Sequence, residues 1–170
     1  LHLDKTQKYH LFLSHSAPRR TQTRPVDGPL RNLVYSALSC FAVWSTGQDQ
    51  CAVIKRQMQL LLPGVVVFLD VDDLVDIGDL EGYVRSTVGM MFFLSKKYFS
   101  SRNCLREIDA ALDMEKYIAL MHEAQEDKGG GTLEVLTNEC SEDRRPKIFK
   151  PERTPIQWHR ISHYPKPTLK

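Results

Sequence analysis

Glu107 is the residue around which an enzymatic role could be built. It lies in a segment where Leu105, Ile108 and Leu112 recur at helical spacing. On such a helix Glu107 falls beside Cys104 and away from the apolar stripe, so its carboxylate can face a cleft. From its position alone, a simpler role is to stabilise the amino end of the helix, because acidic side chains are favourable in the first turns.

A second candidate is an acidic stretch that contains no basic residue. It comprises Asp70, Asp72, Asp73, Asp76, Asp79 and Glu81. The spacing does not reproduce an EF-hand loop, so we interpret the stretch as solvated rather than as a cation site. It could also meet a basic partner surface, such as the later cluster of Arg144, Arg145, Lys147, Lys150 and Arg153, although those cations could equally be a solvated edge.

The remaining motifs that could carry chemistry are incomplete. His122 and Glu123 lack the second histidine of the H-E-x-x-H zinc motif, and His159 and His163 follow a predicted strand, where a spacing of four does not bring two rings together. We therefore expect no metal site. The glycines 129–131 lack the Lys-Ser/Thr partner of a phosphate-binding loop, which favours a flexible loop.

Composition limits the function classes. The chain has 170 residues, enough for one domain, and a net charge of +2, too small for nucleic-acid binding through bulk electrostatics. Four widely spaced cysteines suggest neither a zinc site nor a disulfide framework and indicate a reducing, cytosolic setting. The longest apolar run, residues 60–69, is shorter than the ~20 residues that span a bilayer, so we expect no membrane segment.

Five short apolar runs predict strands that could position these residues: 11–13, 65–69, 90–94, 117–121 and 156–158. The middle runs are apolar throughout, which is typical of parallel strands covered on both faces. Two helices are expected between them. One carries a stripe of Cys51, Ile54, Met58, Leu61 and Leu62, and the other starts with Asn103 as N-cap. This βαβα order predicts a doubly wound α/β sheet with sites at the carboxyl ends of its strands.

Three segments carry a resemblance to a known family. The first, Tyr9–His15, reads YHLFLSH; the second runs from Val67-Phe68-Leu69-Asp70 to Gly78; the third runs from Phe93 through Tyr98 to Cys104-Leu105-Arg106-Glu107-Ile108. In this order they resemble the opening strand, the segment with the BB loop, and the S-x-x-Y to C-L-x-E-L run of TIR (Toll/interleukin receptor/resistance) domains. One departure is Asn103, where the family usually has tryptophan before the cysteine.

The resemblance implies a flavodoxin-like three-layer α/β domain with a five-stranded parallel sheet over residues 9–165. Residues 16–43 are then expected to be an insertion, because a loop this long is uncommon where the fold needs a short one. The alternative is that residues 32–44 form the first core helix. Residues 166–170 are expected to begin a truncated C-terminal helix of a longer protein.

The resemblance also implies a function: cytoplasmic signal transduction, as in innate immunity, through association with other TIR domains, most simply as a homo-oligomer. TIR enzymes cleave NAD with the glutamate of the third motif, which is Glu107 here. Nicotinamide leaves as a neutral group, so one carboxylate that stabilises an oxocarbenium-like transition state can be enough. NAD is then a substrate, and no resident cofactor is expected. An interaction-only scaffold without catalysis stays open.

Further residues follow from the same resemblance. The NAD pocket is expected to hold the residues at the ends of the first two strands and before the glutamate, namely Ser14, His15, Asp70 and Cys104. The contact surface is expected to hold residues of the BB-loop segment, namely Asp72, Asp73, Leu74 and Gly78.

Overall fold

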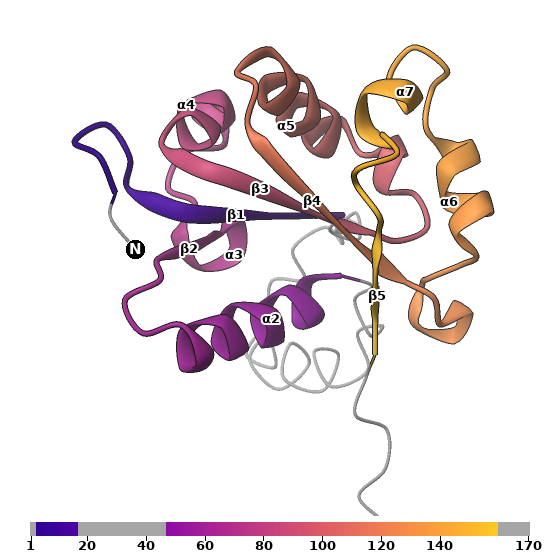
Figure 1. The fold of residues 1–170 in the computed structure, drawn as a ribbon, viewed down its shortest axis with the longest axis horizontal. Helices are drawn as coiled ribbons and strands as arrows, with labels where there is room; N and C mark the ends of the chain where they lie inside the picture. Colours follow the sequence, from indigo (N-terminus) through magenta and orange to yellow (C-terminus); the bar gives the residue numbers. More distant parts are fainter. Residues whose placement is uncertain (1–2, 17–46, 160–170) are drawn as a thin grey trace, which may run out of the picture.

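A five-stranded sheet forms the centre of the computed structural model, which describes residues 3–16 and 47–159 (Figure 1). Its strands are β1 (Tyr9–His15), β2 (Val67–Leu69), β3 (Thr87–Leu94), β4 (Tyr117–Glu123) and β5 (Ile156–Trp158). Every pairing is parallel, in the order β2-β1-β3-β4-β5. The five predicted strands and their parallel arrangement are confirmed.

The central strands are apolar at consecutive positions because both faces of the sheet are covered. Phe12 of β1 pairs with Phe68 and Met90 in the neighbouring strands and packs into one core cluster. Leu13, which points to the opposite face, pairs with Leu69 and packs into the second cluster.

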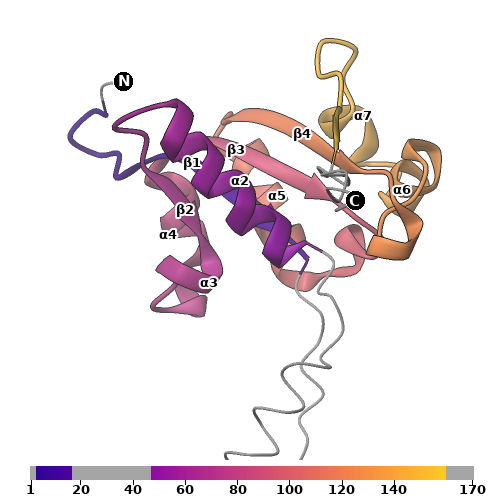
Figure 2. The same ribbon diagram turned by 90° about the horizontal axis from the view of Figure 1, so that it is seen from below.

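Helices complete three layers. They are α2 (Gln48–Leu61), α3 (Asp70–Asp73), α4 (Leu80–Arg85), α5 (Arg102–Asp113), α6 (Leu133–Glu139) and α7 (Arg145–Ile148), with short 3₁₀ turns η1 (Ile77–Asp79), η2 (Tyr98–Ser100) and η3 (Glu126–Lys128). Figures 1 and 2 show α2 on one side of the sheet and α4 and α5 on the other. This is the flavodoxin-like α/β arrangement predicted from the sequence.

The predicted stripe of α2 is buried only in part. Cys51 and Ile54 are buried and Met58 is half-buried, but Leu61 and Leu62 are 78% and 44% exposed. The helical spacing places these residues on one face of α2, but a residue on that face is buried only where another part of the protein packs against it. Strand β2 is the sheet edge and has three residues, so little sheet surface remains for the last turn of α2.

Helix α5 begins earlier than predicted. Its N-cap is Ser101, whose hydroxyl accepts a hydrogen bond from the Cys104 backbone N–H, whereas Asn103 lies inside the first turn. Serine and asparagine cap equally well, and the sequence alone does not choose between positions two residues apart.

The buried face of α5 also differs from the predicted stripe. Leu105 and Leu112 are only half-buried, while the fully buried side includes Ala111, Ile108 and Glu107. Glu107 lies on the same face of the helix as Cys104, Ile108 and Ala111, so it is buried with them.

Some predictions fall outside the described residues. These are the insertion at 16–43, apart from Ser16, the alternative helix at 32–44 and the helix start at 166–170. Among the helices of residues 3–16 and 47–159, none is long and apolar enough to cross a membrane.

Candidate functional site

The candidate site lies where the strand order changes direction. From β1 the chain goes to β2 on one side and then to β3 on the other, so β1 and β3 flank a switch point. Ligands of open parallel sheets bind beyond the carboxyl ends of the strands at such a point. Ser14, His15 and Ser16 at the end of β1 and Ser95 after β3 are all buried, and the Ser16 and Ser95 hydroxyls lie 3.0 Å apart. The fold thus gathers polar groups at its favoured ligand position.

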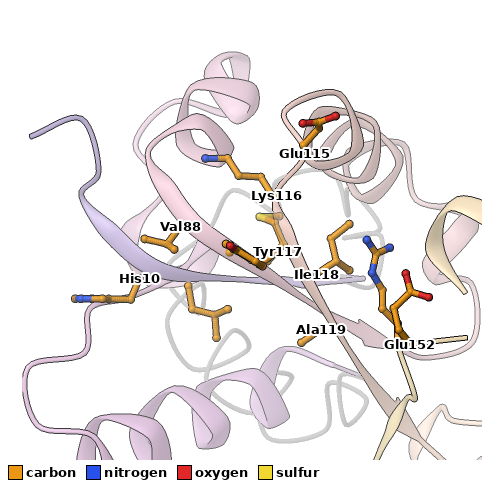
Figure 3. A pocket seen from close by; sticks show the side chains of 12 residues that line it. His10, Val88, Glu115, Lys116, Tyr117, Ile118, Ala119 and Glu152 are labelled. Carbon is orange, nitrogen blue, oxygen red and sulfur yellow. The ribbon is translucent and has the colours of Figure 1, made fainter. Parts of the chain in front are cut away.

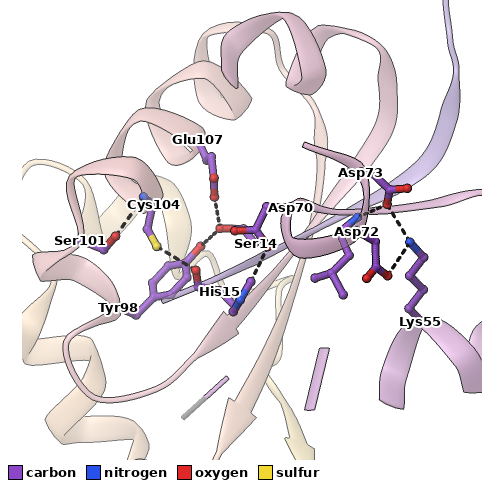
Figure 4. Close-up of polar contacts among 11 residues, drawn as sticks. Ser14, His15, Lys55, Asp70, Asp72, Asp73, Tyr98, Ser101, Cys104 and Glu107 are labelled. Atoms are coloured by element: carbon purple, nitrogen blue, oxygen red, sulfur yellow. Dashed lines mark hydrogen bonds and ion pairs between the residues drawn. The ribbon is translucent and has the colours of Figure 1, made fainter. Parts of the chain in front are cut away.

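Glu107 and Tyr98 are each joined to Ser14 at this position by one short hydrogen bond (Figure 4). Glu107 Oε2 lies 2.5 Å from Ser14 Oγ, which lies 2.5 Å from the Tyr98 hydroxyl. Tyr98, Ser14 and Glu107 are 0%, 1% and 5% exposed. They come from η2, β1 and α5, so the contact depends on the assembled fold.

Local structure fixes each member of the cluster. The Ser101 cap holds the start of α5, and the Cys104 thiol lies 3.3 Å from the His15 carbonyl oxygen, which ties this helix to the end of β1. Glu107 follows Cys104 by one turn. The Tyr98 ring is held by Phe99, which packs against it edge to face at 5.2 Å.

Burial controls the charge of Glu107. Burial raises the pKa of this carboxyl and the Asp70 charge adds to the increase, while the hydrogen bond from Ser14 and the Arg106 charge lower it, and together they leave the pKa at about 8. The carboxyl is therefore mostly protonated at neutral pH. Burial likewise holds the pKa of Tyr98 well above its ordinary value, so that hydroxyl stays neutral.

His15 and Asp70 come together beside the cluster. His15 Nδ1 lies 3.4 Å from Asp70 Oδ1, too far for a short hydrogen bond. Burial lowers the pKa of His15 more than the Asp70 charge raises it, so the ring is neutral near pH 7. Gly47 lies close to this ring, and an added Cβ there would be 3.3 Å from the His15 Cβ.

Cys104 is suited to structure rather than to nucleophilic attack. Burial, together with the nearby Glu107 carboxyl, raises the pKa of its thiol to about 12. A thiol that stays protonated is a poor nucleophile. Its observed role is the contact with the His15 carbonyl oxygen.

Glu107, which we expected to face a cleft, is 5% exposed. A pocket of about 650 Å³ lies at the amino halves of β1, β3 and β4, bordered by His10, Lys116 and Tyr117 (Figure 3). A smaller pocket of about 360 Å³ lies at α4 and α5 and includes Glu81 and Asp109. Neither is lined by Glu107. Ser14 lies against Glu107, and Tyr98 lies against Ser14, where the helical spacing predicted a cleft.

The acidic stretch forms helical turns that are partly neutralised from other elements. Lys55 of α2 lies 3.2 Å from Asp72 and 2.7 Å from Asp73. Arg106 of α5 pairs with Glu81 at 2.6 Å and donates to the Gly78 carbonyl oxygen at 3.1 Å. The interpretation as a solvated stretch holds for Asp72, Asp76 and Asp79, which are exposed, but part of its charge is balanced by cations from α2 and α5.

The proposed contact residues differ in accessibility. Asp72 and Gly78 are exposed, Asp73 and Leu74 are half-buried, and Leu74 packs against the first core cluster. Val75, between α3 and η1, is 94% exposed and was not predicted. The segment therefore presents an apolar tip beside its charges.

Two other motifs have structural partners. Arg144 holds Asp109 with bonds of 2.7 and 2.9 Å, and Arg145 and Arg153 donate to backbone carbonyl oxygens. The N–H groups of glycines 129–131 donate to carbonyl oxygens of residues 123–126. That loop is bonded rather than flexible, and none of its three glycine N–H groups is left for a phosphate. Within the two described ranges, no group of three metal-ligating side chains is found.

A scan against protein-family models and a search of curated proteins find no match to this sequence. Among solved structures, the fold is similar to the TIR domain of the Toll-related receptor TRR-2 from the lower metazoan Hydra magnipapillata. The TM-score is 0.44 and the identity 8%, over 89% of this chain and 85% of that chain. At this identity the likeness is one of fold.

Proposed function

We propose that this chain is a TIR-like signalling domain that associates with other TIR domains and hydrolyses NAD with Glu107. The observation that carries the proposal is the buried carboxyl beside two hydroxyls at the switch point of the sheet. The three sequence motifs support it, because their resemblance assigns the catalytic role to this same glutamate.

The reaction needs little from the protein beyond one negative charge. The bond between the ribose C1′ and the nicotinamide nitrogen breaks, and its electron pair leaves with neutral nicotinamide. The ionised Glu107 stabilises the oxocarbenium-like carbon, and water adds to it, giving ADP-ribose and a proton. His15 and Asp70 border the nucleotide, and Cys104 holds α5 in place.

The closed geometry makes the isolated domain a weak catalyst. Glu107 is 5% exposed and mostly protonated at neutral pH, so the cluster must open before NAD reaches it. Association through the segment that carries Val75 and Asp72 would shift α3, which begins at Asp70 beside His15. We therefore expect NAD hydrolysis to rise with protein concentration.

Nicotinamide release from NAD by the concentrated chain tests the proposal. Glu107→Gln keeps the shape but removes the charge, and release should fall at least about a hundredfold. Asp113→Asn, an exposed change on the same helix, is the matched control and should retain activity. Full activity in Glu107→Gln would remove the catalytic assignment.

The burial of Glu107 also favours a second candidate, an interaction-only scaffold. In that case the carboxyl is a core group, and association is the whole function. Sedimentation velocity and nicotinamide release, measured on the same concentrated samples, separate the two. Association without nicotinamide release identifies the scaffold.

A further inference from the structure

We propose, building on the NAD-cleaving role above, that Tyr98 and Ser14 form a relay of hydrogen-bond donors that positions Glu107 and favours its ionised form. They act as positioning residues and not as catalytic ones. This changes the role expected for Ser14, which the sequence placed against the substrate, and adds Tyr98, which the sequence did not single out.

The geometry of the relay is a chain of three oxygen-bearing groups. Ser14 Oγ lies 2.5 Å from both the Tyr98 hydroxyl and Glu107 Oε2. Both hydroxyl-bearing residues are almost inaccessible to water, at 0% and 1% exposure. Each hydroxyl is therefore committed to its protein neighbour.

Counting protons gives the relay its direction. An ionised carboxylate can only accept, so Ser14 must donate to Glu107, and the Ser14 oxygen then accepts from the Tyr98 O–H. If Glu107 instead donated a proton to Ser14, the Ser14 proton would turn to Tyr98. The Tyr98 proton would then have no acceptor among the described residues, which is costly for a buried hydroxyl. A neutral Glu107 with its proton on Oε1 would keep the same chain, but the hydrogen bond from Ser14 is stronger to a carboxylate than to a neutral carboxyl, so the chain of donors favours the ionised state.

Other groups around the carboxyl act in both directions. Burial and the Asp70 charge at the start of α3 disfavour ionisation, and Arg106 on α5 favours it. The neighbouring Cys104 thiol, Tyr98 hydroxyl and His15 ring are neutral near pH 7. Among the uncharged neighbours, Ser14 is the one whose direct bond stabilises the charge, which leaves the pKa of Glu107 at about 8.

The test is an NMR titration of the Glu107 carboxyl carbon in the full chain. Ser14→Ala should move its pKa upward by about 1 to 2 pH units, the value of one lost hydrogen bond to a charged group. Tyr98→Phe keeps the ring and should give a smaller upward shift. The matched control is Tyr9→Phe, whose ring packs on Phe68 and whose hydroxyl bonds to no described residue; it should give none.

An unchanged or lowered Glu107 pKa in Ser14→Ala would overturn the relay. If Ser14→Ala does not fold, the same criterion applies to Tyr98→Phe, which alters no packing atom of the ring. A purely structural role lowers stability without moving the titration, so the titration distinguishes the two roles.

Nicotinamide release gives a second readout. The pH profile of kcat should move upward with the Glu107 pKa, and kcat at pH 7 should fall about tenfold in Ser14→Ala while KM changes little. If the chain releases no nicotinamide, the proposed function fails, but the carboxyl titration still decides whether the relay exists. A profile that stays in place while the carboxyl pKa moves would refute the catalytic part of the relay.

Discussion

At the carboxyl ends of β1 and β3, the fold buries Ser14, Tyr98 and Glu107, whereas the amino ends of the strands carry the pocket of about 650 Å³. The cations beside that open pocket are already bound. Lys116 donates to the carbonyl oxygens of Arg85 and Thr87, and Arg153 donates to that of Lys147. The carboxyl end instead holds a titratable group with a perturbed pKa.

This difference shows that the open pocket and the group with the perturbed pKa lie at opposite ends of the sheet. The cations that line the open pocket donate to backbone carbonyl oxygens, so the pocket provides a surface for contact but few reactive groups. The buried cluster contains a reactive group, the Glu107 carboxyl, whose charge depends on burial and which a substrate must first reach. Both ends can be perturbed independently, which gives the following tests.

The largest expected effect is on stability, at the carboxyl end. The Glu107 pKa in the folded state, about 8, lies above its ordinary value of 4.5. The resulting stability is present below pH 4.5 and is lost as pH rises through 8. At pH 9, Glu107→Gln should therefore be more stable than the unaltered chain by roughly 3 to 5 kcal/mol in urea unfolding.

The same change at the amino end is the control for this comparison. Glu115 is exposed and borders the open pocket. Glu115→Gln should leave the pH dependence of unfolding as it is. An equal gain in both variants at pH 9 would show that net charge, rather than the burial of Glu107, sets the effect.

A smaller effect is expected from removing a cation at the amino end. Lys116→Met keeps the stem but loses two hydrogen bonds to backbone carbonyl oxygens, so unfolding free energy should fall by about 1 to 3 kcal/mol. Nicotinamide release by the remaining folded protein should not change. A loss of activity per folded molecule would place the open pocket in the reaction.

The smallest effect concerns association. Val75→Ser and Asp72→Asn should each weaken self-association about tenfold or less, measured by sedimentation velocity. The Asp72 effect should shrink with salt, because exposed charges are screened beyond about 8 Å in physiological buffer. Val53→Ser, a half-exposed valine on α2, is the control. Unchanged association in both variants would remove this segment from the interface.

Sequence patterns predicted the sheet better than the site. Continuous apolar runs such as Met90–Leu94 can only be buried on both faces, so they fix strands and layers. The phase of α5 was set from Leu105 and Leu112, but the buried face is the one that Cys104, Ile108 and Ala111 share with Glu107. Helical periodicity does not show which of two apolar stripes has the nearer neighbour.

Two further contacts depend on tertiary structure. Tyr98 lies in a motif that the sequence already offered, but its hydroxyl meets Ser14 across 84 positions of the chain. Lys55 neutralises the acidic stretch from a different helix. The spacing of residues in the sequence does not identify Ser14 as the partner of Tyr98, or Lys55 as the partner of the acidic stretch, because other polar residues along the chain could fill either role equally well.

The pH dependence of nicotinamide release by the concentrated chain tests the central claim most directly. If the ionised Glu107 cleaves NAD, the rate should rise about tenfold for each pH unit below 8 and level off above it, and Glu107→Gln should abolish this rise. A rate that does not depend on pH between 6 and 9, or one that Glu107→Gln preserves, would contradict it.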